Sequence, residues 1–284
     1  AEPFMITAWQ SAERQPAETR DGTAARQLLV RWLIALAEVD DRRLAREVDR
    51  ALGGTVLPVM AVAEAASRST NRALADRVIA VAREEVESAA TVPPQRRLAQ
   101  AVLEQTMAAK HADPAVAARV IELVEPLRED PQLGVDARVV MAQAHAIRGE
   151  RSTAVALYRE ALAMAPDAIL IKNNLAFMLA TGGDACEEAV RLAREALVPG
   201  LTDPGVRSAI LSTLAVSLAC VGETAEAVQR AEEAAGLNPD APDLLATLAW
   251  VRSQAGDEQG AADDAARSRR LISADRFPQR YAEA

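Results

Sequence analysis

The chain has 284 residues, half of them hydrophobic but only 3% aromatic, and its 41 acidic and 32 basic residues give a formal charge of −9. Phosphate backbones and anionic membrane surfaces repel such a chain, so we expect no nucleic acid partner. The longest apolar run, residues 28–39, is interrupted by Arg31 and is too short to span a bilayer, so we expect no membrane insertion. Abundant alanine with few aromatic residues predicts an all-α fold, because alanine favours helix and lets helices approach closely.

The N-terminal half has helical spacing but no regular repeat. Residues 1–20 contain two prolines and mixed charges, and we expect an extended or partly disordered segment there. Residues 21–130 predict irregular helical hairpins, with breaks at 92–94 and 111–114. These hairpins either continue the repeat described below as degenerate copies or form a separate helical cap.

A repeat dominates the second half of the chain. Four similar segments begin at Val135, Ile169, Ser208 and Pro242, so their starts are 34, 39 and 34 residues apart. In each segment a large apolar residue is followed at once by alanine and, seven residues after the alanine, by glycine. The pairs are Met141-Ala142, Leu175-Ala176, Leu214-Ala215 and Leu248-Ala249, and the glycines are Gly149, Gly183, Gly222 and Gly256. The alanine permits a close helix crossing and the glycine suits a left-handed turn, so each segment predicts a helical hairpin.

This order of features resembles the tetratricopeptide repeat family, whose unit has a large-small pair, a glycine turn, alanines in its second helix and a closing proline. Tyr158 occupies the aromatic position of the second helix, and Pro166 and Pro239 occupy the closing position. The resemblance implies a right-handed α-solenoid of helical hairpins. The arginine- and alanine-rich composition suggests a bacterial source.

The resemblance also implies domain boundaries. Residues 131–273 would hold four repeats, and residues 274–284 would cap the last hairpin. The predicted repeats are 135–168, 169–207, 208–241 and 242–273. Extra residues in the turn of the second repeat and in the linker 198–204 predict a kink or a wider spacing before the third repeat.

The sequence offers no catalytic or metal-binding constellation. His111 and His145 are the two histidines, and neither has a second histidine at metal-ligand spacing. We expect His145 to be half-buried between two helices, and Asp113 to cap a helix that Pro114 begins. We therefore expect no enzyme activity, no cofactor and no metal.

Cys186 and Cys220 lie at the turn ends of neighbouring repeats. Two cysteines cannot form a disulfide framework, and we expect free thiols in preference to a disulfide between them. The compartment, cytoplasmic or periplasmic, stays open at this point.

In the tetratricopeptide family the first helix of each hairpin lines the concave face of the solenoid. The resemblance therefore implies a partner-binding groove that presents neutral side chains. Its predicted residues are Val139, Gln143, Asn173, Asn174, Phe177, Ser212, Val216, Thr247 and Trp250. Asn174 would hold a ligand's main chain, with Phe177 and Trp250 forming apolar pockets. In the alternative, Asn173 caps or solvates the helix start and the aromatic side chains pack against neighbouring helices.

These features favour a non-catalytic scaffold that binds a protein or peptide. Neutral residues stand where carboxylate-binding grooves of the family present lysine and arginine, so we expect an apolar or backbone-mediated ligand. Two alternatives are a self-associating structural module of a larger bacterial envelope assembly and the sensor part of a larger multidomain protein.

Overall fold

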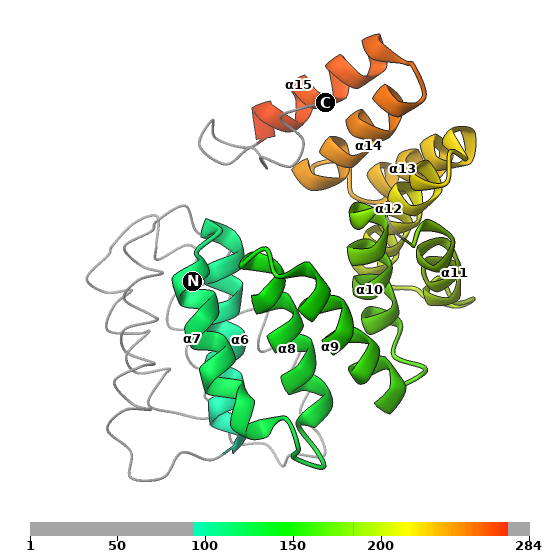
Figure 1. The fold of residues 1–284 in the computed structure, drawn as a ribbon. Helices are drawn as coiled ribbons and strands as arrows, with labels where there is room; N and C mark the ends of the chain where they lie inside the picture. Colours follow the sequence, from blue (N-terminus) through cyan, green and yellow to red (C-terminus); the bar gives the residue numbers. More distant parts are fainter. Residues whose placement is uncertain (1–93, 184, 272–284) are drawn as a thin grey trace, which may run out of the picture. The chain divides into compact units, whose positions relative to one another are not determined.

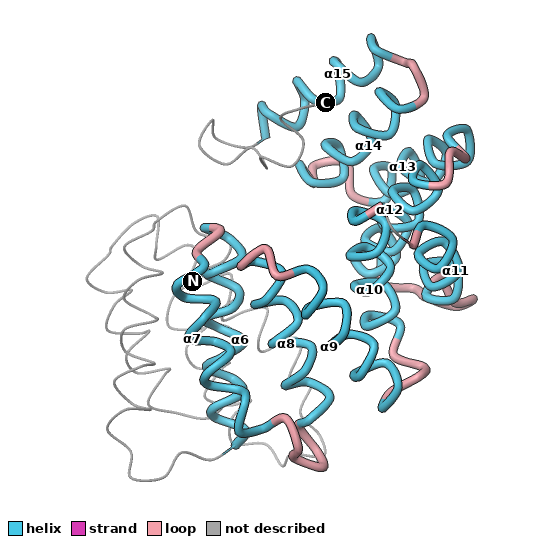
Figure 2. Tube along the Cα trace, in the orientation of Figure 1, coloured by secondary structure: helices cyan, strands magenta, loops and turns pink. Residues whose placement is uncertain are grey.

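The structure, a computed structural model, describes residues 94–183 and 185–271, and every regular element within these ranges is a helix (Figures 1 and 2). The predicted fold class, an all-α solenoid of helical hairpins, is confirmed. The expectations for residues 1–20, for the part of 21–130 before Pro94 and for the cap 274–284 lie outside the described residues. The chain divides into two compact units, 1–154 and 155–284, which are described separately.

In the first unit, α6 (Pro94–His111) and α7 (Pro114–Val124) form a hairpin, and both contact α8 (Gly134–Ile147). Asp113 caps α7 as predicted, because its carboxylate accepts hydrogen bonds from the backbone amides of Ala115 and Val116. The short 3₁₀ helix η2 (Glu125–Leu127) follows α7 directly.

The turn between η2 and α8 is held by the polar contacts of one buried side chain. The guanidinium of Arg138, a buried side chain, donates to the backbone carbonyls of Arg128 and Gly134 and pairs with Glu129. Deeper in this unit the carboxylate of Glu104 is fully buried, where it accepts a hydrogen bond from Gln100 and lies 3.4 Å from Nε of Arg119. Such pairing is what allows a carboxylate to be buried.

The end of α8 is joined to α9 (Arg151–Met164) by a tight turn at Gly149, which has a φ of 78°. His145 is half-buried, as predicted, and its Nδ1 contacts the carboxylate of Glu150. This contact, which the sequence did not predict, lowers the pKa of Glu150, chiefly through the hydrogen bond with His145. The pair joins the last turn of α8 to the residue that precedes α9.

The second unit contains three successive hairpins. They are α10 (Ile169–Gly182) with α11 (Cys186–Ala196), α12 (Pro204–Cys220) with α13 (Thr224–Leu237), and α14 (Pro242–Gln254) with α15 (Glu258–Leu271). The first helices contact one another in the order α10, α12, α14, while α11 packs on α12 and α13 on α14. The hairpins therefore stack in sequence, as in a solenoid. We call α10, α12 and α14 the inner helices and α11, α13 and α15 the outer helices.

The large-small pairs lie in the core of this stack. Leu175, Leu214 and Leu248 are buried, and so are the alanines that follow them. The turn glycines behave as predicted, since Gly183, Gly222 and Gly256 have φ values of 79°, 83° and 82°. Leu211 of α12, Ala234 of α13 and Leu244 of α14 form one core cluster, so successive hairpins share a core.

Ion pairs also connect α9 to α11 and α11 to α13. Arg159 of α9 pairs with Glu188 of α11 at 2.7 Å, and Arg194 of α11 pairs with Glu226 of α13 at 3.2 Å. These side chains are largely exposed, so each pair contributes little to stability by itself.

Candidate functional site

Five exposed or partly exposed side chains of α10 form one stripe along the helix. Leu170, Asn174, Phe177, Met178 and Thr181 follow at intervals of four, three, one and three residues, which places them on one helix face. The opposite face, with Ile171, Leu175 and Leu179, is buried. Asn174 and Phe177 are therefore presented together beside apolar neighbours.

The two adjacent asparagines have different environments. Asn173 is buried, and its Nδ2 donates a long hydrogen bond of 3.4 Å to Oδ1 of Asn174. Its own Oδ1 has no hydrogen-bond partner among the described residues. Asn174 is only partly buried. The N-cap of α10 is Ala168, so the alternative in which Asn173 caps the helix start is wrong.

Phe177 and Trp250 occupy equivalent positions in their helices. Phe177 follows the first residue of α10 by eight residues, and Trp250 follows the first residue of α14 by eight residues. Both side chains are partly buried, whereas Tyr158 of α9 is buried. Phe177 and Trp250 are therefore the partly exposed aromatic side chains of the described residues, one on each side of α12.

The part of α12 and α14 between these rings is closed. The hydroxyl of Ser212 donates to Oγ1 of Thr247 at 3.2 Å, and the hydroxyl of Thr247 donates to the carbonyl of Asp243 at 3.0 Å. Val216 and Thr247 are buried, so a ligand could not reach them on this surface. We call Asn174, Phe177, Ser212 and Trp250 the inner-helix face.

Val139 and Gln143, the remaining predicted groove residues, lie on α8 in the first unit, and both are partly buried. They are not included in the inner-helix face.

The basic side chains of the inner helices all pair with carboxylates of the outer helices. Lys172 of α10 lies 3.1 Å from Glu195 of α11, and Arg207 of α12 lies 2.6 Å from Glu233 of α13. Arg252 of α14 pairs with Glu232 of α13 and Asp264 of α15. The inner-helix face is therefore neutral.

These ion pairs, together with burial, shift the pKa values of the carboxylates. The hydrogen bond from Lys172 is the main cause that lowers the pKa of Glu195. The hydrogen bond from Arg207 does the same for the pKa of Glu233. Burial raises the pKa of Asp264, an effect that the charge of Arg252 opposes.

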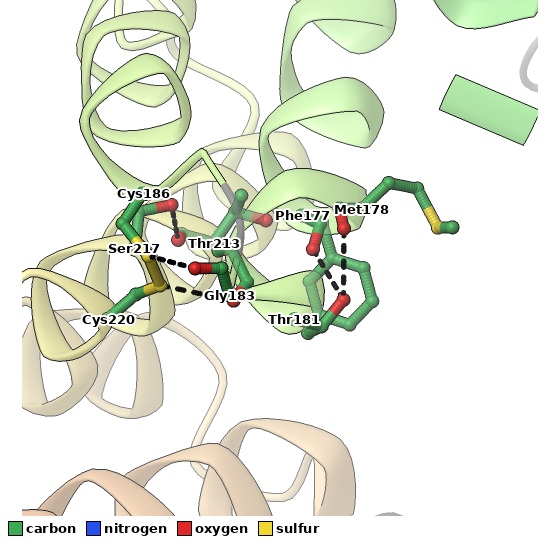
Figure 3. Close-up of a disulfide and its surroundings, with 9 residues drawn as sticks. Phe177, Met178, Thr181, Gly183, Cys186, Thr213, Ser217 and Cys220 are labelled. Carbon is green, nitrogen blue, oxygen red and sulfur yellow. Dashed lines mark hydrogen bonds between the residues drawn. A yellow bond between two sulfur atoms is a disulfide. The ribbon is translucent and has the colours of Figure 1, made fainter. Parts of the chain in front are cut away.

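Cys186 and Cys220 are joined by a disulfide, with their Cα atoms 5.6 Å apart (Figure 3). The expectation of two free thiols is therefore wrong. The two cysteines are 34 residues apart in the chain, the length of one repeat, and this spacing together with their turn-end positions is the sequence feature that indicates the disulfide. The distance between neighbouring turns, which decides whether the bond can form, cannot be read from the sequence.

Among residues 94–183 and 185–271, no group of histidine, cysteine and carboxylate side chains could hold a metal ion. In the same part of the chain, no helix combines the length and apolarity needed to cross a bilayer.

No family model and no curated protein matches the chain. Solved structures of MamA are similar to it. MamA MSR-1 is 19% identical with a TM-score of 0.43, covering 61% of this chain and 96% of that one. MamA from residue 41 to its end from Desulfovibrio magneticus RS-1 is 13% identical with a TM-score of 0.45, covering 60% of this chain and 94% of that one.

Proposed function

We propose that the protein is a non-catalytic interaction scaffold whose inner-helix face binds an extended segment of a protein or peptide. The observation that carries this proposal is the pair of partly exposed aromatic rings, Phe177 and Trp250, at equivalent positions of α10 and α14. Aromatic side chains that remain half-exposed in a folded protein are typical anchors for a binding partner.

The position of the two rings suggests the spacing of the ligand's apolar residues. Adjacent packed helices lie about 8–10 Å apart, so two steps from α10 through α12 to α14 span about 16–20 Å. An extended chain advances about 3.3 Å per residue, so about five or six residues of a ligand would bridge the rings. Asn174 can both donate to and accept from a ligand main chain along the way.

The neutral charge of the face defines the ligand class further. Lys172, Arg207 and Arg252 are engaged by outer-helix carboxylates, so they offer no free positive charge to a carboxylate or phosphate. We therefore propose a ligand recognised through apolar side chains and its backbone, with binding that changes little with salt.

Selection from a random peptide display library tests this proposal. Wild-type protein should enrich peptides with two large apolar residues about five or six positions apart. The Asn174→Ala/Phe177→Ala/Trp250→Ala variant should lose them, and capture by the wild type should persist at high salt. Gln229→Ala, an exposed change on outer helix α13, is the matched control and should retain capture. Equal capture by the triple variant, after circular dichroism shows equal folding, would place binding elsewhere.

A second candidate function, self-association, has its own observation. The large apolar side chains that are exposed in the described residues all lie at linkers between hairpins or at the end of α15. They are Met164, Leu170, Val198, Leu237 and Leu271. Light scattering tests it, since a concentration-dependent mass that falls in a Val198→Ser/Leu237→Ser variant would support this function over the first.

A further inference from the structure

The disulfide joins two helices that the chain already connects at their other ends. Cys186 is the first residue of α11 and Cys220 is the last residue of α12. The two helices are antiparallel neighbours, and the linker 197–203 connects the end of α11 to the start of α12. The disulfide and the linker thus hold this helix pair at both ends.

The next junction of the stack is built differently. The linker between α13 and α14, residues 238–241, is shorter than 197–203 and is held by α15. Arg267 donates to the carbonyl of Pro239, and Ser268 donates to that of Pro242. In the linker 197–203 the backbone amides of Val198 and Leu201 bond only to carbonyls three or fewer residues away. The longer linker is therefore tied to its surroundings by fewer of these hydrogen bonds, and the disulfide adds a covalent constraint to the helix packing at this junction.

The disulfide also touches the helix that carries Phe177. Sγ of Cys220 lies 3.3 Å from the carbonyl oxygen of Ala180, and Sγ of Cys186 lies 3.4 Å from that of Gly183. Figure 3 shows Phe177, Met178 and Thr181 on this last part of α10, where the Thr181 hydroxyl donates to the carbonyl of Phe177. A change at the sulfurs therefore acts directly on the end of α10.

Both cysteines are partly exposed, so a dithiol or a disulfide reagent can reach them. In the reduced state each thiol could donate to the carbonyl it already touches. The reduced protein would keep these local contacts and lose only the covalent link. The pair is thus suited to reversible chemistry within a folded protein.

We infer that Cys186 and Cys220 form a redox-controlled clamp that sets the rigidity of the α11–α12 junction and of the end of α10 that bears Phe177. A disulfide oxidant, either a protein or a small molecule, closes the clamp. One cysteine thiolate attacks the oxidant to give a mixed disulfide, and the other displaces the oxidant's second sulfur. The two cysteines lose two electrons and two protons, and the oxidant leaves as two thiols.

The clamp itself does not depend on the proposed binding function. Only its consequence does, namely that the oxidised protein presents the inner-helix face in one geometry and the reduced protein in several. The test is therefore made without any ligand, so a failure of the clamp and a failure of the scaffold proposal give different results.

Amide hydrogen exchange, combined with thiol titration, tests the clamp. After treatment with oxidised glutathione the whole chain should contain no free thiol. With dithiothreitol, exchange in residues 177–183 and 197–203 should become about ten-fold faster, while exchange in the hairpin α14–α15, which lies outside the loop that the disulfide closes, should change less. The Cys186→Ser/Cys220→Ser variant keeps a hydroxyl donor at each position. Its amide exchange rates should match those of the reduced wild type and should not change when dithiothreitol is added.

Three results would overturn the inference. They are two free thiols after oxidation, equal exchange in the oxidised and reduced wild type, and a reductant effect that spreads evenly to α14 and α15. The last would show general destabilisation in place of a local clamp. Circular dichroism of the reduced protein confirms that the compared forms are folded.

Discussion

Nη2 of Arg207 on α12 lies 2.6 Å from Oε1 of Glu233 on α13, and Arg230 approaches the other oxygen of the same carboxylate at 3.0 Å. One carboxylate on an outer helix therefore receives one cation from its own helix and one from an inner helix. In each inner helix of the second unit the basic side chain pairs with an outer-helix carboxylate in the same way, away from the inner-helix face.

This contact predicts the effect of acid on stability. The hydrogen bond with Arg207 places the pKa of Glu233 below its unfolded-state value of about 4.3. The ionised group thus stabilises the fold above pH ~4.3, and this contribution is lost as the pH falls through the lower, folded-state pKa.

Glu233→Gln should lower the free energy of unfolding at pH 7 by roughly 0.2–1 kcal/mol and leave it unchanged at pH ~2, as measured by urea denaturation. Gln229→Ala, an exposed change on the same helix that removes no titratable group, should show no such difference between the two pH values. An equal loss at both pH values in Glu233→Gln would mean that packing, rather than charge, accounts for the effect.

The disulfide predicts a large stability difference. Its loop spans 34 residues, and closing a loop of that size in the unfolded chain is worth about 3–4 kcal/mol. The Cys186→Ser/Cys220→Ser variant should unfold at a lower urea concentration than the oxidised wild type, and the reduced wild type should match the variant. Equal midpoints for all three would show that the link adds nothing to stability.

Gly222 and Gly236, two glycines of the hairpin α12–α13, predict opposite effects of substitution by alanine. Gly222 ends α12 with a φ of 83°, and a side chain there would meet no neighbour but would strain the backbone. Gly222→Ala should cost about 1–2 kcal/mol.

Gly236 is the matched control, because it lies in the last turn of α13 without a positive φ, and an added Cβ also has open space there. Gly236→Ala should stabilise the protein by about 0.4–1 kcal/mol, because alanine lowers the conformational entropy of the unfolded chain. Thermal unfolding of the two variants checks both signs, and a shift in the same direction for both would contradict the assigned backbone geometry.

The Ser212–Thr247 hydrogen bond predicts a specific cost at the α12–α14 contact. Thr247→Val keeps the shape but removes the acceptor of the Ser212 hydroxyl, so we expect a loss of about 1–2 kcal/mol. Thr247→Ser keeps the oxygen and removes a methyl group. If chemical denaturation found Val better tolerated than Ser, the buried methyl group would matter more than the hydrogen bond.

The regular features of the fold could be predicted from the sequence because each depends on nearby residues. The turn at Gly183 needs a residue that tolerates positive φ, and the cap of α7 needs a short acceptor such as Asp113 before Pro114. Both requirements are local, so the residue types in the sequence are enough to predict the turn and the cap.

The site could be predicted only in part, because the burial of its residues depends on neighbouring helices. Helical spacing alone cannot tell that Val216 and Thr247 are buried while Phe177 stays half-exposed. The pairing of Lys172 with Glu195 and the bond between Cys186 and Cys220 likewise depend on distances between helices that the sequence does not record.

The link between Cys186 and Cys220 encloses the exposed linker residues Val198, Pro199 and Gly200 in a covalent ring with α11 and α12. A protease that cuts this linker opens the ring but separates no part of the chain. Nicked protein would migrate as one intact species on a non-reducing gel and as two fragments after reduction. The oxidised protein is thus protected against separation of the hairpins α12–α13 and α14–α15 from the rest of the chain when this linker is cut.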